Sequence, residues 1–275
     1  MSKLAPFLHP QGFARPHPVA LLREGSVLAE SARYLVRAQA TRWDRRSRPL
    51  SDRHRPRRED PVVLVPGFLA GDGSLGLLSR TLREQGFRVY RSRIGVNVGC
   101  TLDATAVLEQ RLEEIVQRRG RPAQIVGHSL GGMLARGLAV RRPDLVSGIV
   151  TMGSPMLAPA AHHLSLTASV DMLVRLSRAG VPGLMSEECV GGSCARESFE
   201  ESRLPLPERV GFTAIYSRRD GVVDWRACVD PLARAVEVTA SHVGMAVDPR
   251  VHDLVVAALR GEPGSVPEVD RPVGA

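Results

Sequence analysis

A serine stands between two glycines in the segment Gly127-His128-Ser129-Leu130-Gly131. Two apolar residues of β type precede the segment and a helical pattern follows it, so the serine is expected at a sharp turn from a strand into a helix. Such a turn brings neighbouring backbone so close that only glycine fits two positions before and two positions after the serine. The N–H groups at the start of the helix also favour negative charge beside the hydroxyl. The pattern predicts that Ser129 is a nucleophile.

A serine nucleophile needs a base, and the base needs a group that orients it. The predicted strand 210–217 is followed by Arg-Arg-Asp-Gly, which offers Asp220, with Asp224 four residues further on. The predicted strand 235–240 is followed by Ser-His-Val-Gly, which offers His242. Each residue alone also fits an ordinary turn or loop. Their order after the serine, acid and then histidine, and their placement after strands favour a catalytic set.

Apolar β-branched runs alternate with helical patterns from residue 61 onward, which predicts an α/β fold with a doubly wound, mostly parallel sheet. Such sheets carry their chemistry at the carboxyl ends of the strands, where all three candidate residues lie. The expected strands are 62–67, 87–94, 124–128, 147–155, 210–217 and 235–240, and the expected helices are 73–85, 101–119, 130–142, 226–234 and 251–261. Thr101 is the expected N-cap of its helix.

Two segments interrupt or extend this domain, which spans 61–260. Residues 156–207 break the alternation and are partly amphipathic, so they are expected to be a helical cap or lid over the catalytic edge. Their leucines and methionines fit either an acyl pocket or an ordinary buried helix. The tail 261–275 is rich in Pro and Gly and is expected to be disordered.

Residues 1–60 form a basic N-terminal arm. They hold 13 Lys and Arg against 6 Asp and Glu, a net charge of +7 in a chain whose formal charge is +8. Residues 19–43 are expected to be helical, because apolar residues recur there at near-helical spacing, and this arm could pack on or cover part of the main domain. The charge fits either a solvated linker or weak contact with an anionic membrane. No aromatic residue interleaves with the arginines after Trp43, so nucleic acid is not expected as a partner.

Composition narrows the remaining possibilities. No apolar run approaches the length of a membrane span, and the first residues do not form a convincing secretory signal, so a cytoplasmic protein is expected. The four cysteines show no zinc-ligand spacing, and neither a metal nor a cofactor is expected. Free thiols are the default, while Cys189–Cys194 and Cys100–Cys228 are possible disulfides. The pair His162-His163 is expected to be solvated. The oligomeric state is left open.

Four segments together resemble the α/β-hydrolase superfamily, in its small bacterial lipase and esterase type, over roughly residues 61–260. The resemblance lies in Val-Val-Leu-Val-Pro-Gly-Phe as strand and oxyanion turn, Gly-His-Ser-Leu-Gly-Gly as nucleophile elbow, Ile-Tyr-Ser-Arg-Arg-Asp-Gly as acid loop and Ser-His-Val-Gly-Met as histidine loop. It implies Ser129 as nucleophile, His242 as base and Asp220 as acid. Asp220 is preferred to Asp224 because the acid in this family follows the strand directly.

The resemblance further implies an oxyanion hole and an ester substrate. The N–H groups of Phe68 and Leu130 would hold the oxyanion, and we expect Leu69, His128 and Met156 to line the substrate pocket. The implied activity is cleavage of lipid-like or other acyl esters through an acyl-enzyme. Acyl transfer or thioester hydrolysis with the same triad is the alternative, and a non-catalytic binding protein on this scaffold is a third reading.

Overall fold

The computed structural model describes residues 4–47 and 60–262, and its centre is a six-stranded sheet with the order β2-β1-β3-β4-β5-β6. Every pair of neighbouring strands is parallel, so the expected mostly parallel sheet is confirmed. The strands are β1 (Pro61–Val65), β2 (Arg88–Arg91), β3 (Ala123–His128), β4 (Val146–Met152), β5 (Gly211–Ser217) and β6 (Arg234–Val238).

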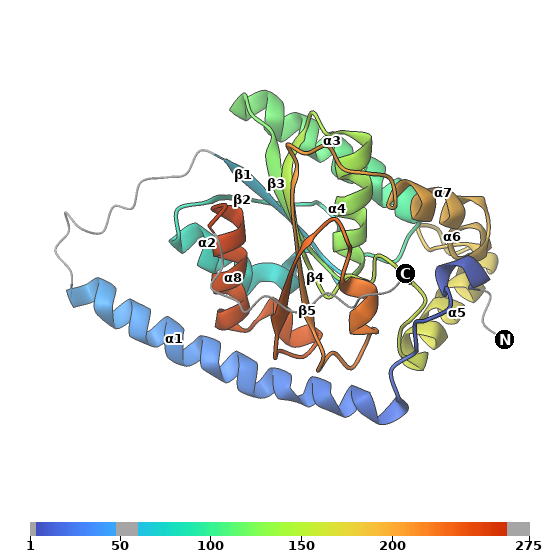
Figure 1. Ribbon diagram of the computed structural model, residues 1–275, viewed down its shortest axis with the longest axis horizontal. Helices are drawn as coiled ribbons and strands as arrows, with labels where there is room; N and C mark the ends of the chain where they lie inside the picture. Colours follow the sequence, from blue (N-terminus) through green and yellow to red (C-terminus); the bar gives the residue numbers. More distant parts are fainter. Residues whose placement is uncertain (1–3, 48–59, 263–275) are drawn as a thin grey trace.

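Helices cover both faces of this sheet (Figure 1). On one side α2 (Gly76–Glu84) and α8 (Pro249–Leu259) pack on alternate strand residues such as Val62 and Leu64. On the other side α3 (Thr101–Arg119) and α4 (Leu130–Arg141) pack on the intervening residues, such as Val63. Because both faces are buried, the central strand β1 is a continuous apolar run, whereas the edge strands β2 and β6 carry charged residues and are only partly buried.

The chain order creates a crevice between β1 and β3. After β1 the chain runs outward to β2, and it then returns to β3 on the other side of β1. Loops leaving the carboxyl ends of two such strands diverge to opposite faces and leave a binding crevice between them. Val65 is in register with Gly127, so the turn after β1 and the turn that carries Ser129 begin side by side.

The N-terminal arm contains a short 3₁₀ turn near its start, a 3₁₀ segment η2 (Pro18–Ser26) and the long helix α1 (Val27–Ser47), which runs along the lower edge in Figure 1 beside α8. The arm docks through polar groups. Arg33 pairs with Asp248 at 2.8 Å, and the Arg37 guanidinium forms two hydrogen bonds with Asp253, at 2.5 and 2.7 Å.

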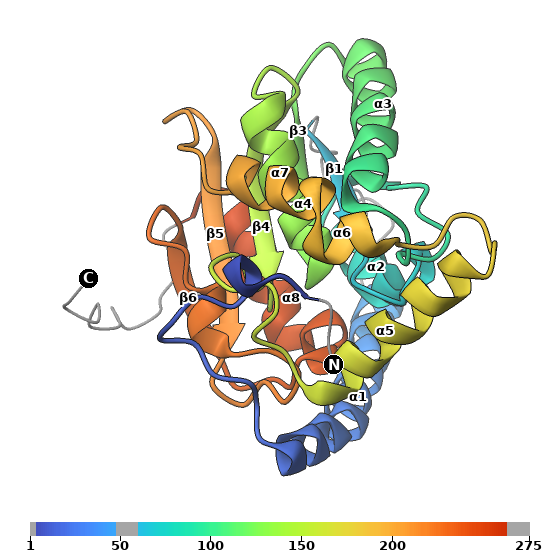
Figure 2. The ribbon, with the colours of Figure 1, turned by 90° about the vertical axis from the view of Figure 1, so that its right-hand side faces the viewer.

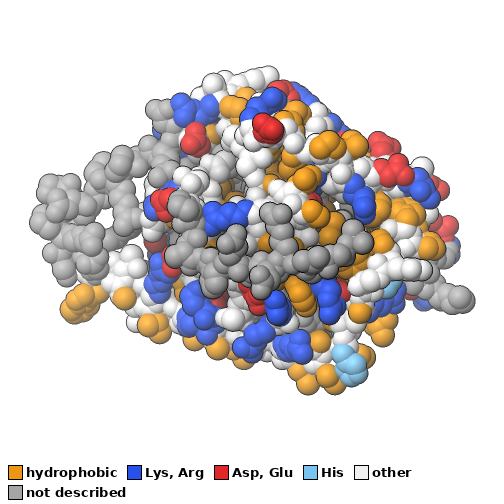
Figure 3. Space-filling model, in the orientation of Figure 1, with side chains coloured by type: hydrophobic (Ala, Val, Ile, Leu, Met, Phe, Trp, Pro, Cys, Tyr) orange, Lys and Arg blue, Asp and Glu red, His pale blue; other side chains and the backbone are white. Residues whose placement is uncertain are grey.

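The apolar stripe of this helix lies away from the domain. Leu28, Leu35 and Val36 are 62–78% exposed and form an outer apolar stripe, while Tyr34 and Glu30 face the domain. The surface that receives the helix explains this orientation, because the carboxylates of α8 and its N-cap attract the arginines. Figure 3 shows apolar side chains along the lower edge with Lys and Arg side chains beside them.

The cap and the start of the arm lie over the same end of the sheet (Figure 2). The insertion after β4 contains α5 (Leu164–Arg178), α6 (Glu187–Gly191) and α7 (Ser193–Glu201). The 3₁₀ turn η1 (Pro6–Leu8) joins them: Ala5 N–H donates to the Val190 carbonyl at 3.1 Å and the Leu8 carbonyl accepts from Ala160 at 2.8 Å. The sequence offered no signal for this docking.

Several local expectations need correction. The expected helix 226–234 is one 3₁₀ turn, η5 (Trp225–Cys228), capped by Asp224. Cys100, not Thr101, is the N-cap of α3. Two further 3₁₀ turns, η4 (Asp72–Leu75) and η6 (Val243–Ala246), flank the site. The expected disorder of the tail after 262, and most of the basic run 42–60, fall outside the described residues. Within the described ranges, no helix combines the length and the apolarity that a bilayer crossing requires.

The four cysteines are free thiols, so neither candidate disulfide forms. Cys100 instead lies next to Cys189. Burial is the main cause that raises the pKa of the Cys100 thiol to about 11, and the hydrogen bond with the Cys189 thiol raises it further.

Candidate active site

Ser129 lies at the elbow between β3 and α4. Its backbone has φ 51° and ψ −122°, a region that non-glycine residues rarely adopt and that marks a strained, functional turn. A Cβ on Gly127 would lie 2.5 Å from the carbonyl carbon of Gly131, and one on Gly131 would lie 2.6 Å from the Pro66 carbonyl oxygen. The two glycines are therefore required by the close approach of backbone around the serine.

The turn after β1 lies directly beside this elbow. A Cβ on Gly67 would be 3.1 Å from the Ser129 Cβ. Buried Asn97 holds the turn in place. Its side-chain N–H donates to the Pro66 carbonyl at 2.9 Å, and its backbone carbonyl accepts the N–H of Leu69 at 3.0 Å. Sequence reasoning missed Asn97, which follows no recognisable motif.

Two backbone N–H groups border the crevice between these turns, those of Phe68 and Leu130. In the part of the chain that the structure describes, neither donates a hydrogen bond to a protein acceptor. Leu130 is the first residue of α4, where helix N–H groups have no partner within the helix. Both groups are thus available to an oxygen bound beside Ser129.

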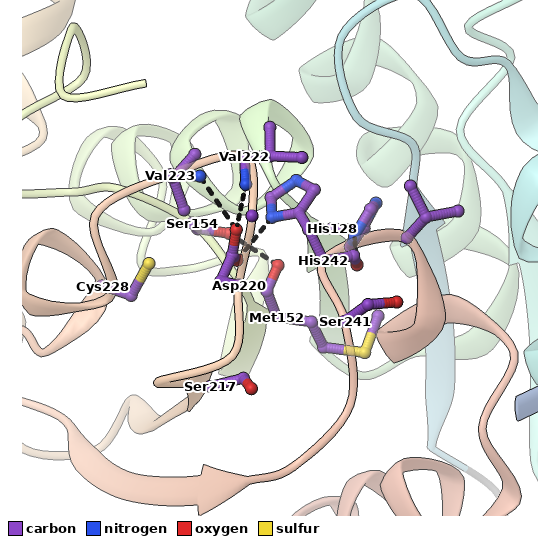
Figure 4. Close-up of polar contacts among 12 residues, drawn as sticks. His128, Met152, Ser154, Ser217, Asp220, Val222, Val223, Cys228, Ser241 and His242 are labelled. Atoms are coloured by element: carbon purple, nitrogen blue, oxygen red, sulfur yellow. Dashed lines mark hydrogen bonds and ion pairs between the residues drawn. The ribbon is translucent and has the colours of Figure 1, made fainter. Parts of the chain in front are cut away.

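Asp220 and His242 form a buried pair (Figure 4). His242 Nδ1 donates to Asp220 Oδ2 at 2.6 Å. The other carboxylate oxygen accepts the N–H groups of Val222 and Val223, both at 2.8 Å, which fixes the carboxylate in the loop after β5. The geometry leaves His242 Nε2 as the nitrogen able to accept a proton.

Asp224 serves a different contact. One of its oxygens accepts the N–H of Ala14 at 2.9 Å, and the other accepts the N–H of Arg226 at 3.1 Å. It therefore ties the N-terminal segment to the loop after β5 and does not contact His242. Of the two candidate acids, the structure brings only Asp220 to the histidine.

Charge and burial give the two neighbouring histidines different properties. Burial acts to lower the pKa of His242, but the charge and hydrogen bond of Asp220, together with the charge of Glu24, raise it above its ordinary value. Burial, and then the nearby His242, lower the pKa of His128 to about 4. His128 is therefore neutral at pH 7, and its Nε2–H donates to the His242 carbonyl at 2.9 Å.

His128, the residue before Ser129 in the chain, contacts His242. The His128 ring, next to Ser129 in the chain, lies 4.9 Å from the His242 ring between centroids. No hydrogen bond joins the hydroxyl of Ser129 to His242 among the described residues. Such catalytic hydrogen bonds commonly tighten only when substrate binds.

Gly153, at the end of β4, closes the site from a third side. Its φ is +57°, and a Cβ there would lie 3.0 Å from His242 Nδ1 and 3.3 Å from Asp220 Oδ2. The residue was not singled out from sequence, although the Gly-Ser-Pro at the end of the predicted strand 147–155 is the signal that could have found it.

A cavity of about 140 Å³ opens at Ser129. Its walls are mainly apolar and come from the oxyanion turn, the elbow, the cap and the N-terminal segment. Apolar side chains that line it include those of Leu4, Leu8, Phe68, Leu166, Val170 and Met185.

The predicted pocket residues lie elsewhere. Leu69 has φ 59° and is 50% exposed, His128 packs on His242, and Met156 is buried; none of them lines this cavity. His162 and His163, expected to be solvated, are both buried: His162 lines the cavity and His163 caps α5. The cap folds against the loop after β5, which the sequence pattern did not indicate.

The switch-point sheet, the serine elbow and the buried histidine–aspartate pair define the class of α/β proteins that present a nucleophile at the carboxyl edge of a parallel sheet. A family model described as the alpha/beta hydrolase family matches residues 62–274, and the chain belongs to this family.

Solved structures agree at the level of the fold. A lipase from Bacillus licheniformis, BlEst2 in its mature form, is similar with a TM-score of 0.59 and 16% identity, over 75% of this chain and 94% of the lipase. The carboxylesterase CesB from Bacillus subtilis is similar with a TM-score of 0.50 and 16% identity, over 76% of this chain and 86% of that one.

Proposed function

We propose that the protein is a serine hydrolase that cleaves carboxylic esters with small apolar acyl groups. Three features of one edge of the sheet support the proposal: the strained elbow at Ser129, two backbone N–H groups without a protein acceptor among the described residues, and His242 bound to Asp220. Each of these features alone has structural uses, but their combination matches what acyl transfer requires.

The mechanism follows from the positions of the groups. His242 Nε2 takes the proton of the Ser129 hydroxyl as the oxygen attacks the ester carbonyl. Asp220 holds the ring in the tautomer with hydrogen on Nδ1 and stabilises the imidazolium that forms. The N–H groups of Phe68 and Leu130 bind the carbonyl oxygen as it becomes negative. His242 then protonates the leaving alcohol, and water repeats the sequence to release the acid.

The cavity supports a small acyl group. Its volume of about 140 Å³ is close to that of a protein cavity that holds one benzene ring, about 150 Å³. Its wall offers apolar side chains, so an uncharged acyl chain of a few carbons fits it best. Longer chains would have to displace Leu4 and Leu8 of the N-terminal segment.

The test combines labelling with a substrate panel. A fluorophosphonate probe is expected to label the wild type and Ser169→Ala, a half-buried serine of α5 that serves as control, but not Ser129→Ala. Nitrophenyl esters of two to twelve carbons are expected to be hydrolysed with an optimum at short chains. Absence of labelling and of turnover in the folded wild type would refute the proposal. Preferred turnover of matched thioesters would reassign the substrate class.

A further inference from the structure

Glu24, in the 3₁₀ segment η2 of the arm, binds backbone of both loops that carry the histidine–aspartate pair. Its Oε1 accepts the N–H of Gly221 at 2.9 Å and that of His242 at 3.1 Å. Its Oε2 accepts the N–H of Val243 at 2.9 Å. One carboxylate thus joins the residue after Asp220 to His242 itself, although these two residues lie 197 and 218 positions from Glu24 in the chain.

Glu30, on the next turn of the arm, supports the same loop from the other side. It is 1% exposed. Its Oε1 accepts the N–H of Ser241 at 2.8 Å and its Oε2 accepts the Ser241 hydroxyl at 2.8 Å, while that hydroxyl accepts the N–H of Gly244 at 3.0 Å. Residues 241–244 are therefore held on both sides of His242 by carboxylates of the arm.

The loops are shaped to receive these carboxylates. A Cβ on Gly221 would collide with the Ala20 carbonyl and lie 3.0 Å from Glu24 Oε1, and a Cβ on Gly244 would collide with the Glu30 carboxylate. Backbone N–H groups that point at a carboxylate form charge-assisted hydrogen bonds, which are stronger than neutral ones. Docking that served only to cover apolar surface would not need glycine at these two positions.

We infer that Glu24 is a positioning residue for the catalytic histidine, that Glu30 supports it, and that the arm is consequently part of the active site. The inference rests on the proposed function in so far as it treats His242 as the base. In this view, Glu24 sets the distance and angle between the Asp220 loop and the His242 loop, on which proton transfer from Ser129 depends.

The electrostatic setting provides a readout that a purely structural role would not change. The charged or titratable groups that face His242 are Asp220 from the β5 loop, Glu24 from the arm and His128 from β3. Burial lowers the pKa of His242, while Asp220 and Glu24 raise it. Removing the charge of Glu24 should therefore lower the pKa of His242, which shifts the acid limb of the rate profile to lower pH.

Two substitutions separate charge from position in the full-length protein. Glu24→Gln removes the charge and turns an amide N–H toward the N–H of one loop residue. Glu24→Asp keeps the charge but is one methylene too short to reach all three N–H groups. Asp253→Asn is the matched control, because it breaks a carboxylate contact between arm and domain that lies away from these loops.

The expected results are specific. With a short nitrophenyl ester, both Glu24 variants should lose about 10- to 100-fold in kcat with little change in KM, as expected when reacting groups are misplaced by a fraction of an ångström. The apparent pKa of the acid limb should fall in Glu24→Gln and stay near the wild-type value in Glu24→Asp. Asp253→Asn should keep both kcat and the profile.

Other outcomes overturn the inference. Wild-type kcat in Glu24→Asp would do so even if Glu24→Gln failed to fold, and so would equal losses in Asp253→Asn. An NMR titration of the His242 ring, assigned by its loss in His242→Gln, tests the charge of Glu24 without any turnover. A wild type that is inactive and is not labelled would refute the proposed function. An active wild type, together with a Glu24→Gln variant whose kcat and pH profile equal those of the wild type, would refute only this inference.

Discussion

Gly131→Ala tests whether the elbow and the oxyanion turn work as one unit. The new Cβ would collide with the Val65 carbonyl oxygen and lie 2.6 Å from the Pro66 carbonyl oxygen. Ordinary contact begins near 3.4 Å, so these backbone atoms must move by about 0.8 Å or more. Since neither partner is a flexible side chain, the displacement passes to the turn that carries the Phe68 N–H.

The substitution should lower catalysis and stability by free energies of similar size. Losing one oxyanion donor costs about 10²- to 10³-fold in turnover, so kcat/KM should fall by about 100-fold. Overpacking of this kind costs about 1–3 kcal/mol of unfolding free energy, which lowers Tm by several degrees. Steady-state kinetics with a short nitrophenyl ester and calorimetry measure the two quantities.

Gly76→Ala is the matched control for this substitution. Gly76 begins α2 with φ −61°, and a Cβ there meets no atom within 4 Å. Activity should be unchanged, and Tm should stay level or rise because alanine favours a helix by about 1 kcal/mol over glycine. A folded Gly131→Ala variant with wild-type kcat/KM would refute the coupling between elbow and turn.

Four further predictions concern the acid, the base, the pocket and the arm. Asp220→Asn should reduce kcat by about 10⁴-fold, while Asp224→Asn should cost less than about 10-fold, and the reverse ranking would reassign the acid. Because only neutral imidazole is a base and the pKa of His242 is raised, kcat/KM should rise with pH through a midpoint above 6.5; a midpoint below that value contradicts the assignment. Leu8→Ala should shift the chain-length optimum to longer esters by enlarging the cavity, which an unchanged panel would disprove. We propose that the outer apolar stripe of α1, together with the basic residues of the arm, binds anionic membranes. Sedimentation with phosphatidylserine vesicles should weaken at high salt and in Leu35→Glu. If the protein is instead a dimer that Leu35→Glu breaks, the stripe binds a second copy of the chain.

The chemistry of the site was largely readable from local patterns. Gly127 and Gly131 could be placed because the elbow constrains backbone within five consecutive residues, and local sterics do not depend on the rest of the fold. The position of Asp220 and His242 after strands was readable because the carboxyl ends of parallel strands share one edge of a sheet. The family resemblance favoured Asp220 over Asp224, and in the structure Asp220 binds His242 while the carboxylate of Asp224 accepts from Ala14.

The role of the arm was not readable from its sequence pattern. Apolar periodicity predicts which face of a helix avoids water, but it does not include the surface that the helix meets. In α1 that surface presents Asp248 and Asp253, so the arginine face docks and Leu35 remains exposed. For the same reason the sequence gives no sign of the contacts of Glu24, since its three N–H partners are brought together only by the fold.

By itself, then, the sequence determined the parallel sheet, the serine elbow and the edge at which acid and base follow, because each depends on residues close together in the chain. The tertiary structure decided how large the cavity at Ser129 is and that carboxylates of the N-terminal arm bind the loop that carries His242. These features depend on contacts between segments about 200 residues apart, such as Glu24 with His242, for which no local periodicity or propensity carries information.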